Sequence, residues 1–359
     1  MEGSYFISGI QQIGIGVEDF HQAWKWYIEH FQMDVRVLED STVAELMLPY
    51  TGQQAQKRHA CIAINMQGGA GFEIWQYADR KPQKRNFEIE VGDLGVFVAK
   101  IKSRNVVQTF EELSAKGVKI LGGLQIAPDG LATFYVEDPF ANIFQIVEEK
   151  SIFKEEKRSS GGGVGVMIGV TDIDKAMTVY RDILGFDQVI YDKTAVFSDF
   201  AVLKGGQGKF RRVLLTHSKA RTGAFSHLLG KGYIELIVAL ERLPRKIYEG
   251  RFWGDPGFIQ VCFDVTYMDN LKKYCEAAGY PFTVDSAAKQ HTDSFDMGEA
   301  AGRFAYIEDP DGTLIELVET HKIPILKKLG LYLNLRKRNR EKALADFLVK
   351  MLGLNRVKY

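Results

Sequence analysis

Alternating and helical patterns of hydrophobic residues follow one another in a fixed order along this chain. Residues 12–35 read as an apolar strand, then an aspartate, then an amphipathic helix, and the same order returns without gaps at 165–188. Asp19 and Asp172 precede the two helices, where a carboxylate can accept from the free N–H groups of the first turn. Strand-like runs follow each helix, so the pattern predicts four units of one strand, one helix and three strands, at roughly 10–80, 95–150, 163–240 and 258–320.

A second repeat shows that the four units are of two kinds. The segments VEDPFANIFQIVE (136–148) and IEDPDGTLIELVE (307–319) each carry an Asp-Pro turn followed by an apolar strand. Two dissimilar units are therefore used twice. Between the halves lies EEKSIFKEEKRSSGGG (148–163), whose charged and then Ser/Gly-rich composition predicts a flexible linker.

Composition and charge exclude several classes of protein. Hydrophobic residues make up 46% and charged residues 26% of the 359 residues, which excludes disorder of the whole chain. Lys+Arg (46) equal Asp+Glu (46), so no overall charge favours nucleic acid. Cys61, Cys262 and Cys275 are widely spaced without a CxxC motif, which excludes a readable disulfide framework or thiolate zinc site. The first residues lack a secretory pattern and no apolar run is long enough to cross a bilayer, which predicts a cytoplasmic protein without a membrane span.

The strand-V-x-D-helix starts at 17–19 and 170–172, together with the D-P-D-G-x-x-x-E element at 309–316, resemble the vicinal oxygen chelate superfamily. Its members include glyoxalase I, methylmalonyl-CoA epimerase, extradiol dioxygenases and bleomycin-resistance proteins. The resemblance covers about residues 10–320 and implies an α+β fold of two domains, each with two paired βαβββ modules forming an open barrel. We expect a first glyoxalase-like domain at 1–150, a second at 151–324 with the main site, and a basic helical tail at 325–359.

Three glutamates stand at equivalent places in apolar strands: Glu73 in GFEIWQY, Glu235 in GYIELIVAL and Glu316 in TLIELVE. Neighbouring residues of a strand point to opposite faces, and both faces of these strands are largely apolar. A carboxylate buried alone is costly, so each of the three needs a metal, another cation or a hydrogen-bond partner.

The resemblance also implies which residues stand where the family places four ligands, on the first and last strands of each module. In the first half they are Gln12, Glu73, Val96 and Gln145, with the register of Val96 uncertain by about two residues. One charge among four predicts no tight metal there, so Gln12 and Glu73 form the weaker second site. In the second half they are Gly165, Glu235, Gln260 and Glu316, an all-oxygen set that suits Mg²⁺, Mn²⁺ or a similar hard divalent ion. The alternative is no metal at all, with the carboxylates satisfied by hydrogen bonds or by an arginine such as Arg211 or Arg303.

Two functions of different classes are compatible with these positions. As an enzyme, the chain would be a glyoxalase-like lyase or isomerase, in which Glu316 or Glu235 moves a proton of a small carbonyl substrate held by the metal. Extradiol dioxygenase chemistry is disfavoured, because the two histidines of that branch correspond to Gly165 and Gln260. As a binding module of the bleomycin-resistance type, the chain would sequester a small ligand without turnover. In both cases we expect the second half to hold the working site and the first half to serve structure or partner contact.

The segment after His321 differs from the rest, because residues 322–359 carry 11 Lys/Arg against 2 Asp/Glu. Five apolar residues between Leu344 and Leu352 recur at helical spacing and predict a helix that docks on its own chain or forms a homodimer. The basic block 336–342 would meet the acidic remainder of the protein or an anionic partner. His217, His227 and His291 are predicted to be loop or surface residues rather than ligands.

Overall fold

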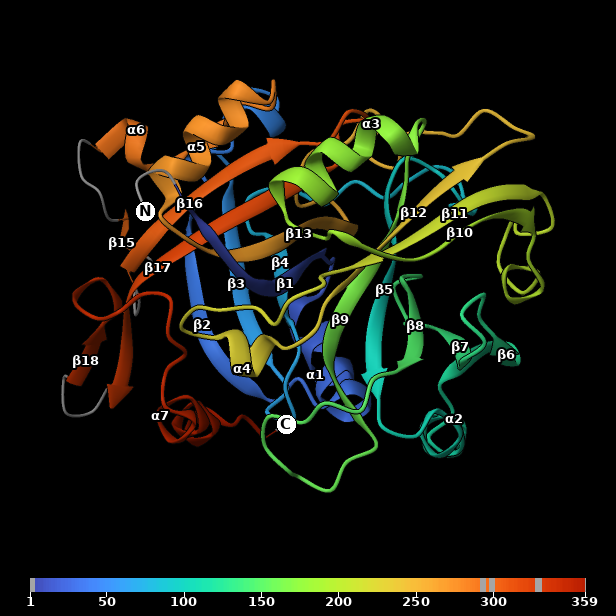
Figure 1. Cartoon of the computed structure of the whole chain (residues 1–359), viewed down its shortest axis with the longest axis horizontal. Coiled ribbons are helices and arrows are strands. Elements are labelled where there is room, and N and C mark those ends of the chain that lie inside the picture. The colour runs from blue at the N-terminus through green and yellow to red at the C-terminus, as the bar shows by residue number, and fades with distance from the viewer. Residues whose placement is uncertain (1–3, 291–294, 297–300, 327–330, 359) are drawn as a thin grey trace.

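The computed structural model describes residues 4–290, 295–296, 301–326 and 331–358 of the chain. Four βαβββ modules follow one another, as predicted (Figure 1). The first comprises β1 (Phe6–Gly16), α1 (Phe20–Phe31), β2 (Val35–Val43), η1 (Leu48–Tyr50), β3 (Lys57–Ile64) and β4 (Gly71–Tyr77). The second comprises β5 (Gly95–Ser103), α2 (Val106–Ala115), β6 (Lys119–Ile126), β7 (Ala132–Glu137) and β8 (Ile143–Glu148).

The second half repeats this order with short additions. Its first module comprises β9 (Ser160–Gly169), α3 (Ile173–Met177), the π-helical η2 (Thr178–Ile183), β10 (Gln188–Val196), η3 (Ser198–Phe200), β11 (Lys209–Thr216), α4 (Ser226–Leu229) and β12 (Tyr233–Ala239). Its second comprises β13 (Gly257–Thr266), α5 (Met268–Ala277), β14 (Val284–Asp285), α6 (Ser286–Gln290), β15 (Phe295–Asp296), β16 (Ala301–Glu308) and β17 (Leu314–Leu326). The tail comprises β18 (Leu331–Asn334), η5 (Leu335–Lys337), α7 (Asp346–Lys350) and η6 (Met351–Asn355).

The modules pair across the two halves and not within them. In the described part of the chain, one sheet runs β14-β16-β17-β13-β1-β4-β3-β2, and we call it sheet A. The other runs β10-β11-β12-β9-β5-β8-β7-β6, and we call it sheet B. The first and fourth modules therefore share sheet A through the antiparallel β1–β13 pair, and the second and third share sheet B through β5–β9. The predicted α+β fold with two sets of paired modules is confirmed, but each pair takes one module from each half of the chain and not two from the same half as expected. Hydrophobic alternation specifies which face of a strand is buried but not which edge it joins.

Each half nevertheless keeps a link between its own two modules. Asp19 and Asp172 cap α1 and α3 through their side chains, as predicted, the former accepting from Gln22 N at 2.9 Å. Eight residues after each of these aspartates, a tyrosine hydroxyl donates a hydrogen bond to a second aspartate. Tyr27 donates to Asp138 at 2.7 Å, and the repeat-related Tyr180 donates to Asp309 at 2.8 Å. The aspartates of the two Asp-Pro turns thus tie the helix of one module to the last hairpin of the next.

The predicted linker is only partly a linker. Residues 160–163 form the buried start of β9, and Gly163 bridges to Ala70 at the junction of the two sheets. A Cβ at Gly162 would lie 2.7 Å from the Ala70 carbonyl oxygen, so the glycines allow two backbones to approach closely. The expectation of a flexible Ser/Gly joint is therefore wrong for these residues, which are extended because they pair in sheet B.

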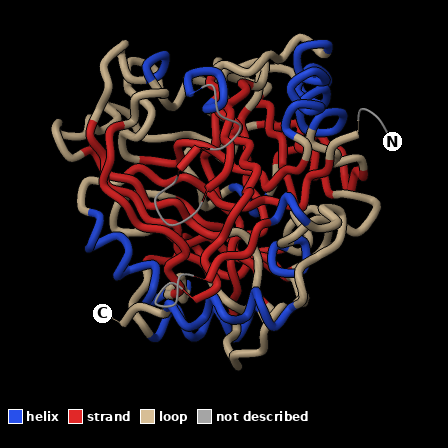
Figure 2. Tube along the Cα trace, turned by 90° about the vertical axis from the view of Figure 1, so that its left-hand side faces the viewer, coloured by secondary structure: helices blue, strands red, loops and turns tan. Residues whose placement is uncertain are grey.

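Helices cover the outer faces of both sheets and enclose the main core (Figures 1 and 2). Ile13 of β1, Phe72 of β4 and Val261 of β13 are buried in that core together with residues of α1 and α5. Their strand neighbours face the opposite, concave side, which therefore receives Gln12, Glu73 and the other polar groups described below. None of the helices in the described ranges is long and apolar enough to cross a membrane.

The basic tail docks on its own chain. Leu335, Leu344 and Val349 are buried in a cluster with Val35 and Met66 of the first module. Arg340 pairs with Glu319, and Arg356 pairs with Asp34 and with Glu156. The predicted helix is short, with α7 spanning Asp346–Lys350, and its basic neighbours contact acidic groups of the same molecule. A homodimer through the tail stays a prediction.

Candidate functional site

Four polar side chains from four strands converge on the concave face of sheet A. They are Gln12 from β1, Glu73 from β4, Gln260 from β13 and Glu316 from β17. The strand register brings them together, because Cys262 lies opposite Gln12 on one side and Glu316 on the other, and Gly14 lies between Gln260 and Glu73. A Cβ at Gly14 would lie 2.8 Å from Cδ of Gln260, so glycine leaves room for the amide at this crossing. The first and the second half of the chain each supply two of the four.

The two glutamates share their hydrogen-bond donors. Gln260 Nε2 donates to Glu73 Oε2 at 2.7 Å and to Glu316 Oε2 at 3.1 Å. Gln12 Nε2 lies 3.5 Å from Glu73 Oε2 and 3.3 Å from Glu316 Oε2. Gln260 is 0%, Gln12 2% and Glu316 7% exposed, whereas Glu73 keeps an intermediate exposure. Two carboxylates thus face one another through two amides, and Glu73 is the one that solvent reaches most.

The electrostatics of this cluster favour protonation. Burial raises the pKa of Glu73 to about 8, with a further contribution from the neighbouring Glu316 and a smaller opposing one from Arg58. Burial also raises the pKa of Glu316, against the hydrogen bonds from Cys262, Tyr306 and the two glutamines. Close carboxylates oppose each other's ionisation, so at neutral pH the pair holds a shared proton unless a cation takes its place.

The orientation of one amide is determined by a tryptophan. Trp253 lies between β12 and β13 and donates its Nε1–H to Gln260 Oε1 at 2.6 Å. Because an indole N–H can only donate, the oxygen of Gln260 must face Trp253 and its NH₂ group must face the glutamates. Gln12 differs, because its buried Oε1 has no hydrogen-bond partner among the described residues. Gln260 therefore acts as a donor to the carboxylates, whereas Gln12 has a free acceptor oxygen.

These donors fit a hard divalent ion through oxygen ligands. Within the described ranges no three His, Cys, Asp or Glu side chains gather as a metal cluster, so the glutamine amides decide the ligand set. Gln12 Nε2 also faces the carboxylates, but the Gln12 amide can turn because its oxygen has no hydrogen-bond partner among the described residues. The two carboxylates and the turned Gln12 Oε1 would then give three oxygens, the ligand chemistry of Mg²⁺ and Mn²⁺. Gln260, a predicted ligand, would have to give up the Trp253 hydrogen bond to offer its oxygen.

Glu235 lies elsewhere, at the equivalent position of sheet B, and is surrounded by cations. Lys100 Nζ donates to Glu235 Oε2 at 2.7 Å and to the Gln145 amide oxygen. Arg212 Nε donates to Glu235 Oε1 at 2.8 Å, and the Tyr191 hydroxyl donates to the same oxygen at 2.6 Å. Although burial raises it, Arg212 and Lys100 hold the pKa of Glu235 at about 2. Glu235 is therefore a satisfied anion.

The expected set of Glu235, Gln260 and Glu316 is thus not one site. Gln260 and Glu316 lie with Gln12 and Glu73, the pair that we assigned to a weaker site, because the modules pair across the halves. Arg211 and Arg303, the arginines considered as partners, bind Asp192 and Asp285 instead. Lys100 of β5 lies beside Gln145 of β8 in sheet B, and Cys262 of β13 lies beside Glu316 of β17 in sheet A, so Lys100 and Cys262 occupy equivalent positions. Lys100 was missed, although the two lysines of the largely apolar strand GVFVAKIKS indicate buried ammonium groups, which need partners.

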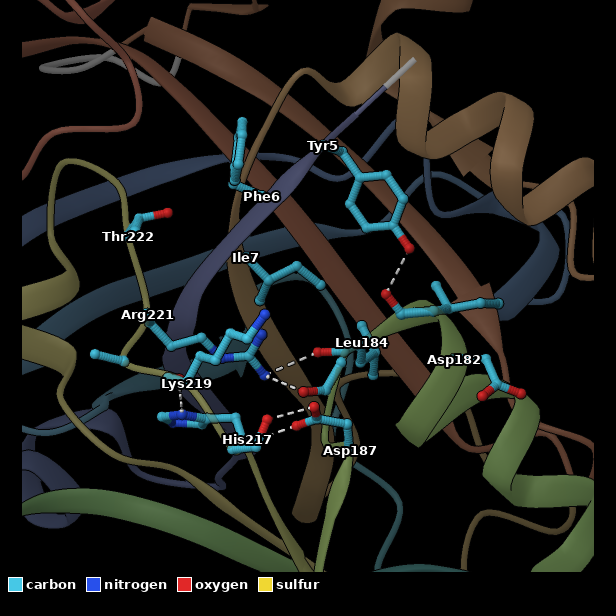
Figure 3. A pocket seen from close by; sticks show the side chains of 14 residues that line it. Tyr5, Phe6, Ile7, Asp182, Leu184, Asp187, His217, Lys219, Arg221 and Thr222 are labelled. Carbon is cyan, nitrogen blue, oxygen red and sulfur yellow. Dashed lines mark hydrogen bonds between the residues drawn. The ribbon is translucent and has the colours of Figure 1, made fainter. Parts of the chain in front are cut away.

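His217 and His227 stand away from both clusters. His217 belongs to a surface cavity of about 330 Å³ beside Tyr5 and Arg221 (Figure 3). Its Nδ1 lies 2.8 Å from the Lys219 carbonyl oxygen, and its Nε2 accepts from Gly232 N at 3.3 Å. Exposed His227 pairs with Asp346 of the tail, and His291 lies outside the described residues.

Comparisons with known proteins agree with the fold. The model of the Glyoxalase/Bleomycin resistance protein/Dioxygenase superfamily matches residues 9–146 and 164–317. Glyoxalase I from Zea mays is similar in structure, with a TM-score of 0.53, 14% identity and coverage of 88% of this chain and 92% of that one. A putative dioxygenase from Bacillus subtilis has a TM-score of 0.54 and 14% identity, with coverage of 88% and 86%. The search of curated protein sequences finds no match.

Proposed function

The chain belongs to the glyoxalase/bleomycin resistance protein/dioxygenase superfamily, and from this membership we propose that sheet A carries a glyoxalase-like lyase or isomerase site for a small carbonyl compound. The observation that carries the proposal is the meeting of Glu73 and Glu316 on shared amide donors. In the described part of the chain, no lysine or arginine forms an ion pair with either carboxylate. Such a pair is suited to hold a divalent ion and to move a proton.

Gln12 Oε1 and the carboxylates of Glu73 and Glu316 would hold the ion, with Gln260 as a hydrogen-bond donor beside them. A divalent cation in such a site supplies Lewis-acid polarisation of a carbonyl and offsets negative charge that develops during proton transfer. Three protein ligands would leave coordination positions of the ion open for substrate oxygens, which is typical of catalytic metal sites rather than structural ones.

Glu73 is the better candidate for the proton transfer. It is the most exposed of the four residues, and a general base must be within hydrogen-bond reach of the proton that it takes from the substrate. Glu73 would take a proton from a hydroxyl-bearing carbon next to the substrate carbonyl and return it to the former carbonyl carbon, while the hydroxyl proton moves to the former carbonyl oxygen. Glu316, more deeply buried, and Gln260 would keep the Glu73 carboxylate in place through the shared hydrogen bonds. Glu235 has no part in this step.

A second candidate function is sequestration of a small ligand without turnover, as in a binding module of the bleomycin-resistance type. The observation that favours it is the Trp253 hydrogen bond, which turns the NH₂ group of Gln260 toward the site and removes one potential metal ligand. In this case the glutamates would keep their shared proton and accept hydrogen bonds from a polar ligand.

Metal titration of the EDTA-treated full chain tests the proposal. We expect calorimetry with Mg²⁺, Mn²⁺, Co²⁺, Ni²⁺ and Zn²⁺ to show one ion per chain for the natural protein. Glu316→Gln should weaken binding by roughly 100-fold or more, because it removes a charged ligand. The matched Glu235→Gln variant, at the equivalent strand position of sheet B, should bind as the natural protein does. If no ion binds and Glu316→Gln changes nothing, the enzyme proposal is wrong and sequestration is favoured.

A further inference from the structure

Sheet B contains a cavity of about 200 Å³ above the Glu235 cluster. Lys100, Gln145, Tyr191 and Glu235 line its polar side, and Val147, Ile190 and Leu214 contribute apolar wall. At about 30 Å³ for each water-sized group, the volume holds roughly six or seven such groups. The cavity is therefore smaller than the sites of drug-sized ligands and suits a compact molecule with one polar end.

The polar side of this cavity has a fixed cation with spare donor capacity. A lysine ammonium has three N–H donors, and two of those of Lys100 go to Glu235 and Gln145. Lys100 is 4% exposed and itself lines the cavity, so its third N–H is available to an acceptor there. Arg212 forms two further ion pairs, with Glu235 and Asp199. The two cations, Lys100 and Arg212, and the two carboxylates, Glu235 and Asp199, then have a formal charge of zero together. The cluster needs no metal and no counter-ion.

We propose that the sheet B cavity is a second, metal-independent ligand site, in which Lys100 donates a hydrogen bond to the carbonyl oxygen of a small neutral ketone or aldehyde. The ammonium stands at the strand position that Cys262 occupies in sheet A and takes the electrostatic role of a bound cation. The apolar remainder of the ligand contacts Val147, Ile190 and Leu214.

The charges around the opening favour a neutral ligand over a carboxylate. Asp129 and Glu148 also line the cavity, and Lys231 is the cation beside them. Glu148 is itself paired with Lys150 at 3.1 Å, so Asp129, Glu148, Lys150 and Lys231 together leave the opening with no net formal charge. A ligand that brings a full negative charge would find no uncompensated cation there, since Asp129 offsets the charge of Lys231 and Glu235 balances that of Lys100.

A series of five-membered rings tests the proposal by ligand-observed NMR on the EDTA-treated full chain. Cyclopentanone presents a carbonyl, methylenecyclopentane has the same shape without an acceptor, and cyclopentanecarboxylate carries the charge. We expect the ketone to bind, the alkene to bind roughly tenfold more weakly or worse, and the carboxylate to bind more weakly than the ketone. The proposal is overturned if the ketone does not bind, if the alkene binds equally well, or if the carboxylate binds best.

Variants locate the binding and separate it from the sheet A site. Lys100→Met combined with Glu235→Gln keeps the cluster neutral and should weaken ketone binding at least tenfold. Ile190→Trp, on the partly exposed edge strand β10, should block the cavity without touching the ion pairs. Glu316→Gln should bind the ketone as the natural protein does, whatever becomes of the metal proposal. Ketone binding that survives both sheet B variants, or that is lost in Glu316→Gln, contradicts the assignment to Lys100.

Discussion

Sheets A and B have four equivalent strand positions, but they stabilise a buried glutamate at these positions with different partners. Sheet A places Gln12, Glu73, Gln260 and Glu316 there, and sheet B places Gly165, Glu235, Val98 and Gln145. In sheet B, Lys100 and Arg212 neutralise the single glutamate from within the chain. In sheet A, two glutamates share amide donors and hold a proton. The two sheets therefore differ in the source of the compensating charge, which is Lys100 and Arg212 in sheet B and a shared proton in sheet A.

The pKa values of the two glutamates record the difference. Burial acts on both, yet the pKa of Glu73 rises to about 8 beside Glu316, whereas Arg212 and Lys100 hold that of Glu235 at about 2. An internal cation stabilises the charged form of Glu235 at every pH above its pKa. Glu73 has no such partner, so its charged form depends on what the site binds.

The largest expected effect comes from removing the internal cation. Lys100→Met leaves Glu235 with Arg212 alone in a dry cluster of net charge −1, and breaking a buried ion pair in this way costs about 3–5 kcal/mol. Denaturation by urea measures the loss. Lys102→Met is the control, because Lys102 is also 4% exposed on β5 but donates to the Ser151 carbonyl rather than to a carboxylate. Equal losses in the two variants would mean that the Lys100–Glu235 pair adds nothing beyond packing.

Much of the fold could be predicted from periodicity and repeats. The four modules lie where the pattern placed them, and the aspartates at 19 and 172 cap their helices. The partner of each module could not be predicted, since β1, β5, β9 and β13 are all apolar and each can join more than one edge. The order of strands in a sheet depends on contacts between distant segments, which local patterns do not contain.

The uncertainty in module pairing also explains why the site residues were grouped wrongly. The glutamates at 73, 235 and 316 were identified as unusual because each is a carboxylate in an apolar strand, and all three prove to be in polar clusters. Which of them share a site depends on module pairing, so Glu235 was grouped with the wrong partners. The register of β5 was uncertain, and the true counterpart of Gln260 is Val98 rather than Val96. Metal and catalytic roles for these residues stay predictions.

A substitution that copies sheet B into sheet A should abolish the metal site. Cys262 stands beside Glu316 as Lys100 stands beside Gln145, so Cys262→Lys places an ammonium next to two carboxylates. We expect divalent ions to bind roughly 100-fold more weakly or not at all, because the lysine satisfies the charge that an ion would. Calorimetry gives the affinity, with Cys262→Met as the control of similar length and no charge. Unchanged affinity in the lysine variant would show that the two positions are not equivalent.

The pH dependence of metal binding is the next effect in size. An ion displaces the proton from the Glu73–Glu316 pair, so affinity should rise about tenfold per pH unit below the pKa of about 8 and level off above it. Without metal, the contribution of this pair to folding stability changes with pH in the opposite direction. The folded state holds a proton that the unfolded state, with an ordinary value of 4.5, has lost, so this contribution falls as pH rises from about 4.5 to 8.

Mn²⁺ titrations between pH 6 and 9, in buffers of different ionisation enthalpy, measure both the affinity and the protons released. We expect about one proton per ion below pH 8 and none well above it. Glu235→Gln should leave this profile unchanged, since Glu235 is already ionised throughout the range. A flat profile, with no proton released, would mean that the glutamates of sheet A do not share a proton.

The smallest effect should come from the tryptophan that orients the Gln260 amide. Trp253→Phe removes the donor to Gln260 Oε1, so the amide is free to turn its oxygen toward the glutamates. Loss of one buried hydrogen bond costs about 0.5–1.5 kcal/mol of stability, while a divalent ion gains a fourth oxygen ligand. We therefore expect Mn²⁺ to bind up to about tenfold more tightly even though the protein is less stable. Trp253→Phe combined with Gln260→Leu provides the control, because it lacks the amide and should lose the gain. Weaker Mn²⁺ binding in the single variant would instead show that Gln260 supports the site as a hydrogen-bond donor to the glutamates, in the orientation that Trp253 imposes.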